Sequence, residues 1–311
     1  MPFPISFIAS LENRLSEFVT WGESKGIKFH ESRVLKYIEL LRCYRDALER
    51  GRMDDLIESR GAAYLDQIHL EIAELIYLYE SLRNFKDSRL KTRFQTIIRG
   101  PELLQEDVTG DSRDTQFELQ IAALLFRVEM SELRFDGRHD LVCSLDQNPL
   151  IIECKRPRKD KTLKESYAKA AYQIETSDLF AENPNTRGIV ALDLTQIVVP
   201  VLTGTRLSSL KEMEKAFLEE LMRGWRGLQI TISDYSDKVS GVHLFCQAPF
   251  YLIDGDRFSL SIPSQHGLVV INTKDHPKNE KIANTYAGLL KGVSNASSDY
   301  EPKNDAITSA A

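Results

Sequence analysis

The chain has 311 residues, of which 42% are hydrophobic and 28% charged, a balance typical of a globular protein with room for two modest domains. No run approaches the roughly 18 to 20 apolar residues of a membrane span, and no basic signal segment opens the chain, so we expect a cytoplasmic protein. The net charge of −6 argues against a protein that coats nucleic acid nonspecifically, but not against a local basic groove.

The cysteines and histidines lack the spacing of zinc ligands. No CxxC, HExxH or HxH pattern occurs. We therefore expect buried, reduced thiols and no structural zinc site. The cysteines are Cys43, Cys143, Cys154 and Cys246.

Residues 1–99 are predicted to form an all-α domain, because their apolar side chains recur at helical spacing. The three main apolar runs cover residues 7–19, 34–48 and 65–82, a short helix is expected at 88–98, and breaks fall at 22–26 and 51–61. These helices are candidates for holding a protein partner or forming a homo-oligomer.

Periodicity is lost over residues 100–114, which carry Gly, Pro and Asp and are predicted to be a linker. A mixed α/β domain is predicted over 115–293, with a mixed central sheet flanked by helices, followed by a disordered tail at 294–311. Helices are expected at 115–130, 162–182, 207–223 and 277–291, strands at 138–144, 149–155 and 188–194, and a β meander at 241–273.

The most informative stretch ends in Glu153-Cys154-Lys155, directly after the apolar residues 150–152. Residues two apart in a strand share a face, so the Glu153 and Lys155 side chains project together. Charged side chains at the end of a hydrophobic strand need partners.

Asp140 lies on the preceding predicted strand, and the length of the turn decides what it faces. A two-residue connection, 147–148, places Asp140 opposite Lys155, whereas a four-residue connection, 145–148, places it opposite Glu153. Either register puts the three side chains on one face of the sheet. Two carboxylates offer hard oxygen ligands for Mg²⁺, and the lysine can orient a water, take its proton or neutralise charge beside it.

This arrangement resembles the PD-(D/E)XK, or restriction-endonuclease-like, nuclease superfamily. Its pattern is an Asp, then (D/E)-x-K on an adjacent strand, after a helix that bears a Glu. Asp140, Glu153 and Lys155 match the three motif positions, Glu118 matches the helix carboxylate, and Gln173 matches a glutamine of several branches. The proline that usually precedes the Asp is replaced by a histidine. The resemblance covers residues 115–195, with elements in the order αββαβ.

The resemblance implies a Mg²⁺- or Mn²⁺-dependent nuclease, acting on DNA rather than RNA, of a build seen in restriction and anti-phage effectors. Asp140 and Glu153 would hold the metal, with Glu118 as a further ligand, and Lys155 would assist the attacking water. The alternative from another class is a non-catalytic nucleic-acid-binding or scaffold subunit that keeps the fold. An enzyme of other chemistry has no P-loop, GxSxG or GxGxxG pattern to support it.

Simpler interpretations stand beside these assignments. Glu118 fits a capping box that begins at Thr115, and Gln173 fits a structural position on a half-buried helix. His139-Asp140 suggests an HD phosphohydrolase, but that fold needs helices where this pair precedes a strand.

Six of the ten residues from Lys155 to Lys164 are basic, on an otherwise acidic chain. Such runs are usually solvated, but this one begins at the proposed catalytic lysine, which favours phosphate binding. The residues predicted to contact nucleic acid are Arg156, Arg158, Lys159 and Lys161.

Overall fold

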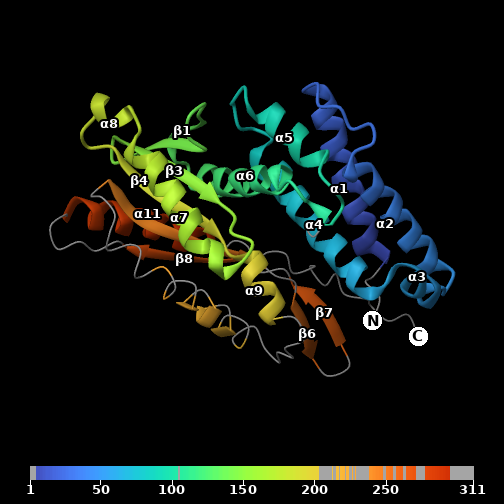
Figure 1. Cartoon of the computed structure of the whole chain (residues 1–311). Coiled ribbons are helices and arrows are strands. Elements are labelled where there is room, and N and C mark those ends of the chain that lie inside the picture. Colours follow the sequence, from blue (N-terminus) through green and yellow to red (C-terminus); the bar gives the residue numbers. More distant parts are fainter. Residues whose placement is uncertain are drawn as a thin grey trace.

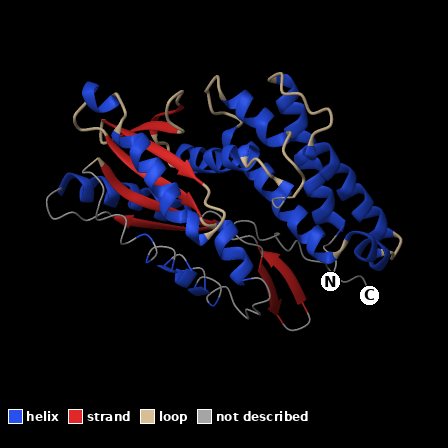
Figure 2. Ribbon diagram, in the orientation of Figure 1, coloured by secondary structure: helices blue, strands red, loops and turns tan. Residues whose placement is uncertain are grey.

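A computed structural model describes residues 5–103, 106–202, 238–247, 250–254, 257–261, 264–270 and 277–294, together with scattered positions between 212 and 228. Its architecture is a mixed α/β sheet flanked by helices and preceded by a group of helices (Figures 1 and 2). The predicted fold class is confirmed at this level.

The N-terminal part consists of helices, as the apolar periodicity predicts. They are α1 (Ile5–Ser24), α2 (Arg33–Glu49), α3 (Met53–Arg60), α4 (Ala62–Leu82) and α5 (Leu90–Ile98). Ser32 caps α2, since its side chain accepts a hydrogen bond from the Leu35 backbone N–H. The expected break over 51–61 is wrong for most of its length, because α3 occupies residues 53–60.

The main sheet has six strands in the order β1-β2-β3-β4-β5-β8. Strand β3 is antiparallel to β2 and parallel to β4, which in turn is parallel to β5. The strands of this sheet are β1 (Ser131–Phe135), β2 (Leu141–Leu145), β3 (Asn148–Lys155), β4 (Arg187–Asp193), β5 (Val239–Gln247) and β8 (Ser264–Val270).

The turn between β2 and β3 consists of Asp146 and Gln147 alone, because Leu145 pairs with Asn148. Both turn residues have positive φ, 50° and 65°, which suits a two-residue hairpin whose twist matches its strands. Leu141 pairs with Ile152, so the next position outward brings Asp140 opposite Glu153. This pairing is the one expected from a four-residue connection, but the connection itself is wrong, because residues 145 and 148 pair and leave a turn of two residues.

Helices cover both faces of the sheet. On one face α6 (Asp111–Arg127) packs against β3 and α11 (Pro277–Ser294) packs against β5 and β8, and alternate strand residues such as Cys143 and Ile152 are buried there. On the other face α7 (Asp160–Glu175) and α9 (Thr195–Leu202) cover Ile151, Val190 and Leu192. Neighbouring residues such as Ile151 and Ile152 face opposite sides because successive side chains of a strand point to opposite faces of the sheet.

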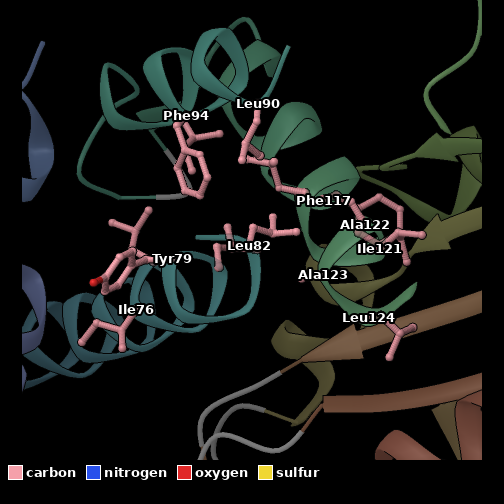
Figure 3. Close-up of a cluster of buried hydrophobic side chains, with 14 of the residues drawn as sticks. Ile76, Tyr79, Leu82, Leu90, Phe94, Phe117, Ile121, Ala122, Ala123 and Leu124 are labelled. Carbon is pink, nitrogen blue, oxygen red and sulfur yellow. The ribbon is translucent and has the colours of Figure 1, made fainter. Parts of the chain in front are cut away.

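Helix α6 is shared between the N-terminal helices and the sheet. One hydrophobic cluster runs from α4 and α5, through Phe117 and Ile121 on α6, to Ile152 on β3. Figure 3 shows the part of it that lies on α4, α5 and α6. Residues 119–125 of α6 are all buried, so this helix has apolar neighbours all around its axis. In Figure 1 it lies between α4 and α5 on one side and the sheet on the other.

Several predicted elements differ from those in the structure. The polar edge strand β1 was not predicted, nor was α9, and the helix expected over 162–182 divides into α7 and α8 (Leu179–Glu182). The meander is wrong in its pairing, since β5 pairs with β8 while β6 (Phe250–Asp254) and β7 (Arg257–Ser261) form a separate hairpin. Most of the helix expected at 207–223, and the tail from 295, lie outside the described residues.

The cysteines are free thiols, and all but Cys43 are buried. The expectation of burial is therefore wrong for Cys43 alone. Over the described part of the chain, no helix combines the length and the apolar character needed to cross a bilayer.

A buried polar network joins α2, α4 and α6. Glu71 forms ion pairs with Arg33 and Arg113, and all three side chains are at most 6% exposed. Gln116 accepts a hydrogen bond from Arg33 and donates one to Glu74. Burial and then the charge of Glu71 raise the pKa of Glu74 to about 7.

This raised pKa predicts a pH-dependent stability. Between roughly pH 4.5 and 7 the folded state keeps the Glu74 proton while the unfolded chain releases it, so stability falls as pH rises, by up to about 1.4 kcal/mol per pH unit. Glu74→Gln should remove this loss. Urea unfolding at several pH values would measure this loss of stability. If the free energy of unfolding depended on pH equally in the two proteins, the prediction would be contradicted.

Candidate active site

Asp140, Glu153 and Lys155 are brought together at neighbouring ends of β2 and β3. Asp140 lies one residue before β2, while Glu153 and Lys155 lie at the end of β3. The Lys155 Nζ atom lies 3.5 Å from Asp140 Oδ2 and 3.4 Å from Glu153 Oε2. The cluster predicted from the sequence is therefore present as a geometric arrangement.

Asp140 is held by the backbone of β3 as well as by Lys155. Its Oδ2 atom accepts a hydrogen bond of 2.7 Å from the Cys154 N–H. Because β2 begins only at Leu141, this N–H is available to a side chain at the strand end. The bond fixes the Asp140 carboxylate beside Glu153.

Glu153 is fully buried, with a side-chain exposure of 0%. Its Oε1 atom is 2.7 Å from His139 Nδ1, and the other ring nitrogen of His139 is 2.8 Å from Ser177 Oγ. Burial, and then the charge of Asp140, raise the pKa of Glu153, against the opposing hydrogen bond from His139. A buried carboxylate beside a second one attracts a cation.

Lys155 contacts both carboxylates, and its side chain is 24% exposed. Burial alone would lower the pKa of Lys155, but the charges of Asp140 and Glu153 outweigh burial and raise it. The ammonium thus faces the two acids from a position that remains accessible to solvent.

Glu118 lies on α6 and forms an ion pair with Arg93 of α5. The capping-box interpretation is wrong, because α6 begins at Asp111, with Gly110 as its N-cap, and Thr115 lies in its second turn. Arg93, rather than Asp140 or Glu153, is thus the partner of Glu118 in this structure.

Gln173 lies half-buried on α7. Among the described residues, no hydrogen bond joins its side chain to Asp140, Glu153 or Lys155. The structure therefore does not bring Gln173 into the cluster.

The four residues predicted to contact nucleic acid divide into one largely buried residue and three exposed ones. Arg156 forms an ion pair of 2.7 Å with buried Asp193, and its side chain is only 9% exposed. Its prediction as a surface phosphate contact is corrected accordingly, because its charge is already paired. Arg158, Lys159 and Lys161 are exposed around the start of α7, and Arg158 also donates to the Val108 carbonyl.

The donor set suits magnesium better than zinc. Asp140 and Glu153 supply hard carboxylate oxygens, and Mg²⁺ is commonly held by one or two carboxylates while it keeps several waters. A structural zinc site would need four protein ligands, usually nitrogen and sulfur. Across the described ranges, no group of three or more His, Cys, Asp and Glu side chains is placed to hold a metal ion.

A hollow of about 530 Å³ lies between α5 and the first turn of α6. Its lining includes Lys91, Arg99 and Asp111 but none of the three clustered residues. The candidate active site and this concavity are therefore separate features of the surface.

Three neighbours of the cluster were not assigned a role from the sequence: His139, Ser177 and Arg93. His139 precedes Asp140 directly, so its position was a usable signal for a side chain that orients the buried acid. Ser177 and Arg93 lie far along the chain, 38 and 46 residues from His139, and no local pattern marks them.

Comparisons with known proteins give no match. No protein-family model matches the chain, and neither the curated proteins nor the solved structures include one with significant similarity.

Proposed function

We propose that the protein is a metal-dependent nuclease that hydrolyses phosphodiester bonds, with Asp140, Glu153 and Lys155 as its catalytic centre. The observation that carries this proposal is the contact of one lysine with two carboxylates at the adjoining ends of neighbouring antiparallel strands, at 3.4 and 3.5 Å. The resemblance to the PD-(D/E)XK pattern supports it, because that pattern expects an acid and an acid-x-lysine pair on adjacent strands after a helix.

Each side chain has a defined task in this proposal. Asp140 and Glu153 would hold Mg²⁺ or Mn²⁺, which when bound would acidify a water and offset the charge of the phosphate. Lys155 would orient the attacking water and donate to negative charge that develops at the phosphate. His139 would keep the Glu153 carboxylate in position through its bond to Oε1.

The nucleic acid would approach along the exposed basic residues at the start of α7. Arg158, Lys159 and Lys161 follow Lys155 within six positions, so phosphates bound there would lie near the carboxylates. We propose DNA as the substrate, and a role in restriction or anti-phage defence, on the resemblance alone.

The direct test is incubation with supercoiled plasmid, linear DNA and RNA, each with Mg²⁺, Mn²⁺ or EDTA. The proposal expects cleavage that requires the metal and is lost in Asp140→Asn and Glu153→Gln. Binding without cleavage by the wild-type protein, in every metal, would favour the non-catalytic nucleic-acid-binding subunit instead.

The exposed basic residues should dominate the salt dependence of binding. Replacing Arg158, Lys159 and Lys161 with Ala should flatten the slope of log affinity against log salt by roughly 0.9 for each phosphate of duplex DNA that the protein no longer neutralises. The measurement is a binding titration at several salt concentrations in a Glu153→Gln background, which prevents cleavage. An unchanged slope would mean that this surface is only solvated.

Arg156→Ala is the matched comparison within the same run. It removes one basic residue from the sequence but leaves Asp193 as an unpaired buried acid. We expect this change to lower stability and to leave the salt slope close to that of its parent protein.

A further inference from the structure

Arg93 connects the N-terminal helices to the acidic side chains of the candidate site. It lies on α5, forms an ion pair with Glu118, and its guanidinium carbon is 4.2 Å from the centre of the Phe135 ring. Both members of the ion pair are largely buried, with exposures of 18% and 15%. A guanidinium held between a carboxylate and an aromatic face has few other orientations.

The segment that leads into α5 fixes the end of β1 beneath Arg93. Asp87 accepts a hydrogen bond from the Phe135 N–H, and Arg89 donates one to the Phe135 carbonyl. Both backbone groups of Phe135 are thus bonded to the same short stretch that precedes α5. The ring under Arg93 is therefore held in position from two sides.

Arg93 also lies close to the candidate site, because Phe135, whose ring it covers, pairs with Leu141, the residue directly after Asp140. Burial lowers the pKa of its guanidinium, and the negative charge of Asp140 is the strongest influence that opposes this shift. Asp140 and Glu118 therefore act on the same cation, although they come from different elements.

We propose that Arg93 is a built-in counter-cation of the candidate site, which pairs with Glu118 and weakens the binding of a divalent cation near Asp140. This inference rests on the proposed function only for the metal, because the contacts of Arg93 are independent of any reaction. In this proposal the N-terminal helices have a function, because α5 carries the positive charge that lowers the metal affinity of the candidate site.

Electrostatics gives the direction of the effect. A fixed positive charge near Asp140 repels an incoming divalent cation, and the ion pair keeps Glu118 from serving as an additional ligand. Removing the charge of Arg93 relieves the repulsion and releases a carboxylate. Both changes favour metal binding.

The test is calorimetric titration of the full chain with Mn²⁺, without nucleic acid. Arg93→Met should bind Mn²⁺ at least about 5-fold more tightly than the wild type, at the lower end of usual coupling between sites. Arg93→Lys keeps the charge and should stay close to the wild type. Lys91→Met is the matched control, because Lys91 is exposed on the same helix and its replacement changes the net charge equally.

Two further variants identify the part played by Glu118. Adding Glu118→Gln to Arg93→Met should cancel most of the gain in affinity. Glu118→Gln alone should leave the affinity unchanged or lower it, since it leaves the positive charge of Arg93 without its partner. This variant also tests the proposal if Arg93→Met fails to fold, and an increase of about 2-fold or more in its affinity would overturn the proposal.

The outcomes separate this inference from the proposed nuclease. The expected shift in Mn²⁺ affinity, in a protein that cleaves no substrate, would support the counter-cation and refute the nuclease. Metal-dependent cleavage with equal Mn²⁺ affinity in wild type and Arg93→Met would support the nuclease and overturn the counter-cation. Absence of Mn²⁺ binding in both proteins would overturn the inference.

Discussion

Replacing Lys155 with Ala is expected to slow phosphodiester cleavage by about 100- to 1000-fold, the usual loss when a preorganised charged donor is removed from an active site. The Nζ atom contacts both carboxylates, so its loss removes the charge that would orient the water and offset the phosphate. Nucleic-acid affinity should change little, because the exposed basic residues at the start of α7 remain. Single-turnover cleavage at saturating metal would measure the effect.

Lys164→Ala is the control for this variant. Lys164 is an exposed lysine of α7, so its removal changes the net charge equally and leaves the three clustered residues in place. Thermal unfolding of both variants would exclude a general loss of structure. Normal cleavage by a folded Lys155→Ala protein would exclude the mechanism proposed for this lysine.

Glu71→Ala is expected to lower the free energy of unfolding by about 3 to 5 kcal/mol, the range measured when one partner of a buried ion pair is removed. Two arginines, Arg33 and Arg113, share this carboxylate in a region where none of the three side chains reaches solvent appreciably. The variant leaves both guanidinium groups buried with less compensating charge. Urea denaturation would give the difference.

Glu80→Ala provides the comparison at the surface. Glu80 pairs with Arg14, but this carboxylate is 40% exposed, and such pairs contribute at most about 1 kcal/mol. The buried variant should therefore be several times more destabilised than the exposed one. If the two decreases in stability were equal, the network around Glu71 would have no special part in joining α2, α4 and α6.

Strongly periodic segments were predictable from the sequence. The apolar repeats of α1, α2 and α4 and the continuous hydrophobic strand β4 were all expected within a few residues of their bounds. Less regular segments were not. Strand β1 is polar and mostly exposed at the edge of the sheet, and the pairing of β5 with β8 depends on contacts that no local pattern encodes.

The part of the candidate site that depends on the alternation of side chains along a strand was predictable. Alternation put Glu153 and Lys155 on one face, but two registers for Asp140 stayed open until the Asp146–Gln147 turn was known. The partners of Glu118 and Arg156 could not be predicted, since Arg93 and Asp193 approach from distant elements. Ion pairs between residues far apart in the sequence decide which charged side chains remain available at the surface. A run of charged residues in the sequence does not show which of them form such pairs.

The burial of α6 on all sides has a consequence for how this chain can be dissected. A fragment that begins near residue 111 would lose α4 and α5, which pack against α6 in the intact protein, and would expose part of the apolar surface of α6. Such a fragment would tend to aggregate, and a fragment of the N-terminal helices alone would lack the other half of its core. Binding and cleavage are therefore better separated by point substitutions than by truncation, and the helices and the sheet should melt in one cooperative transition.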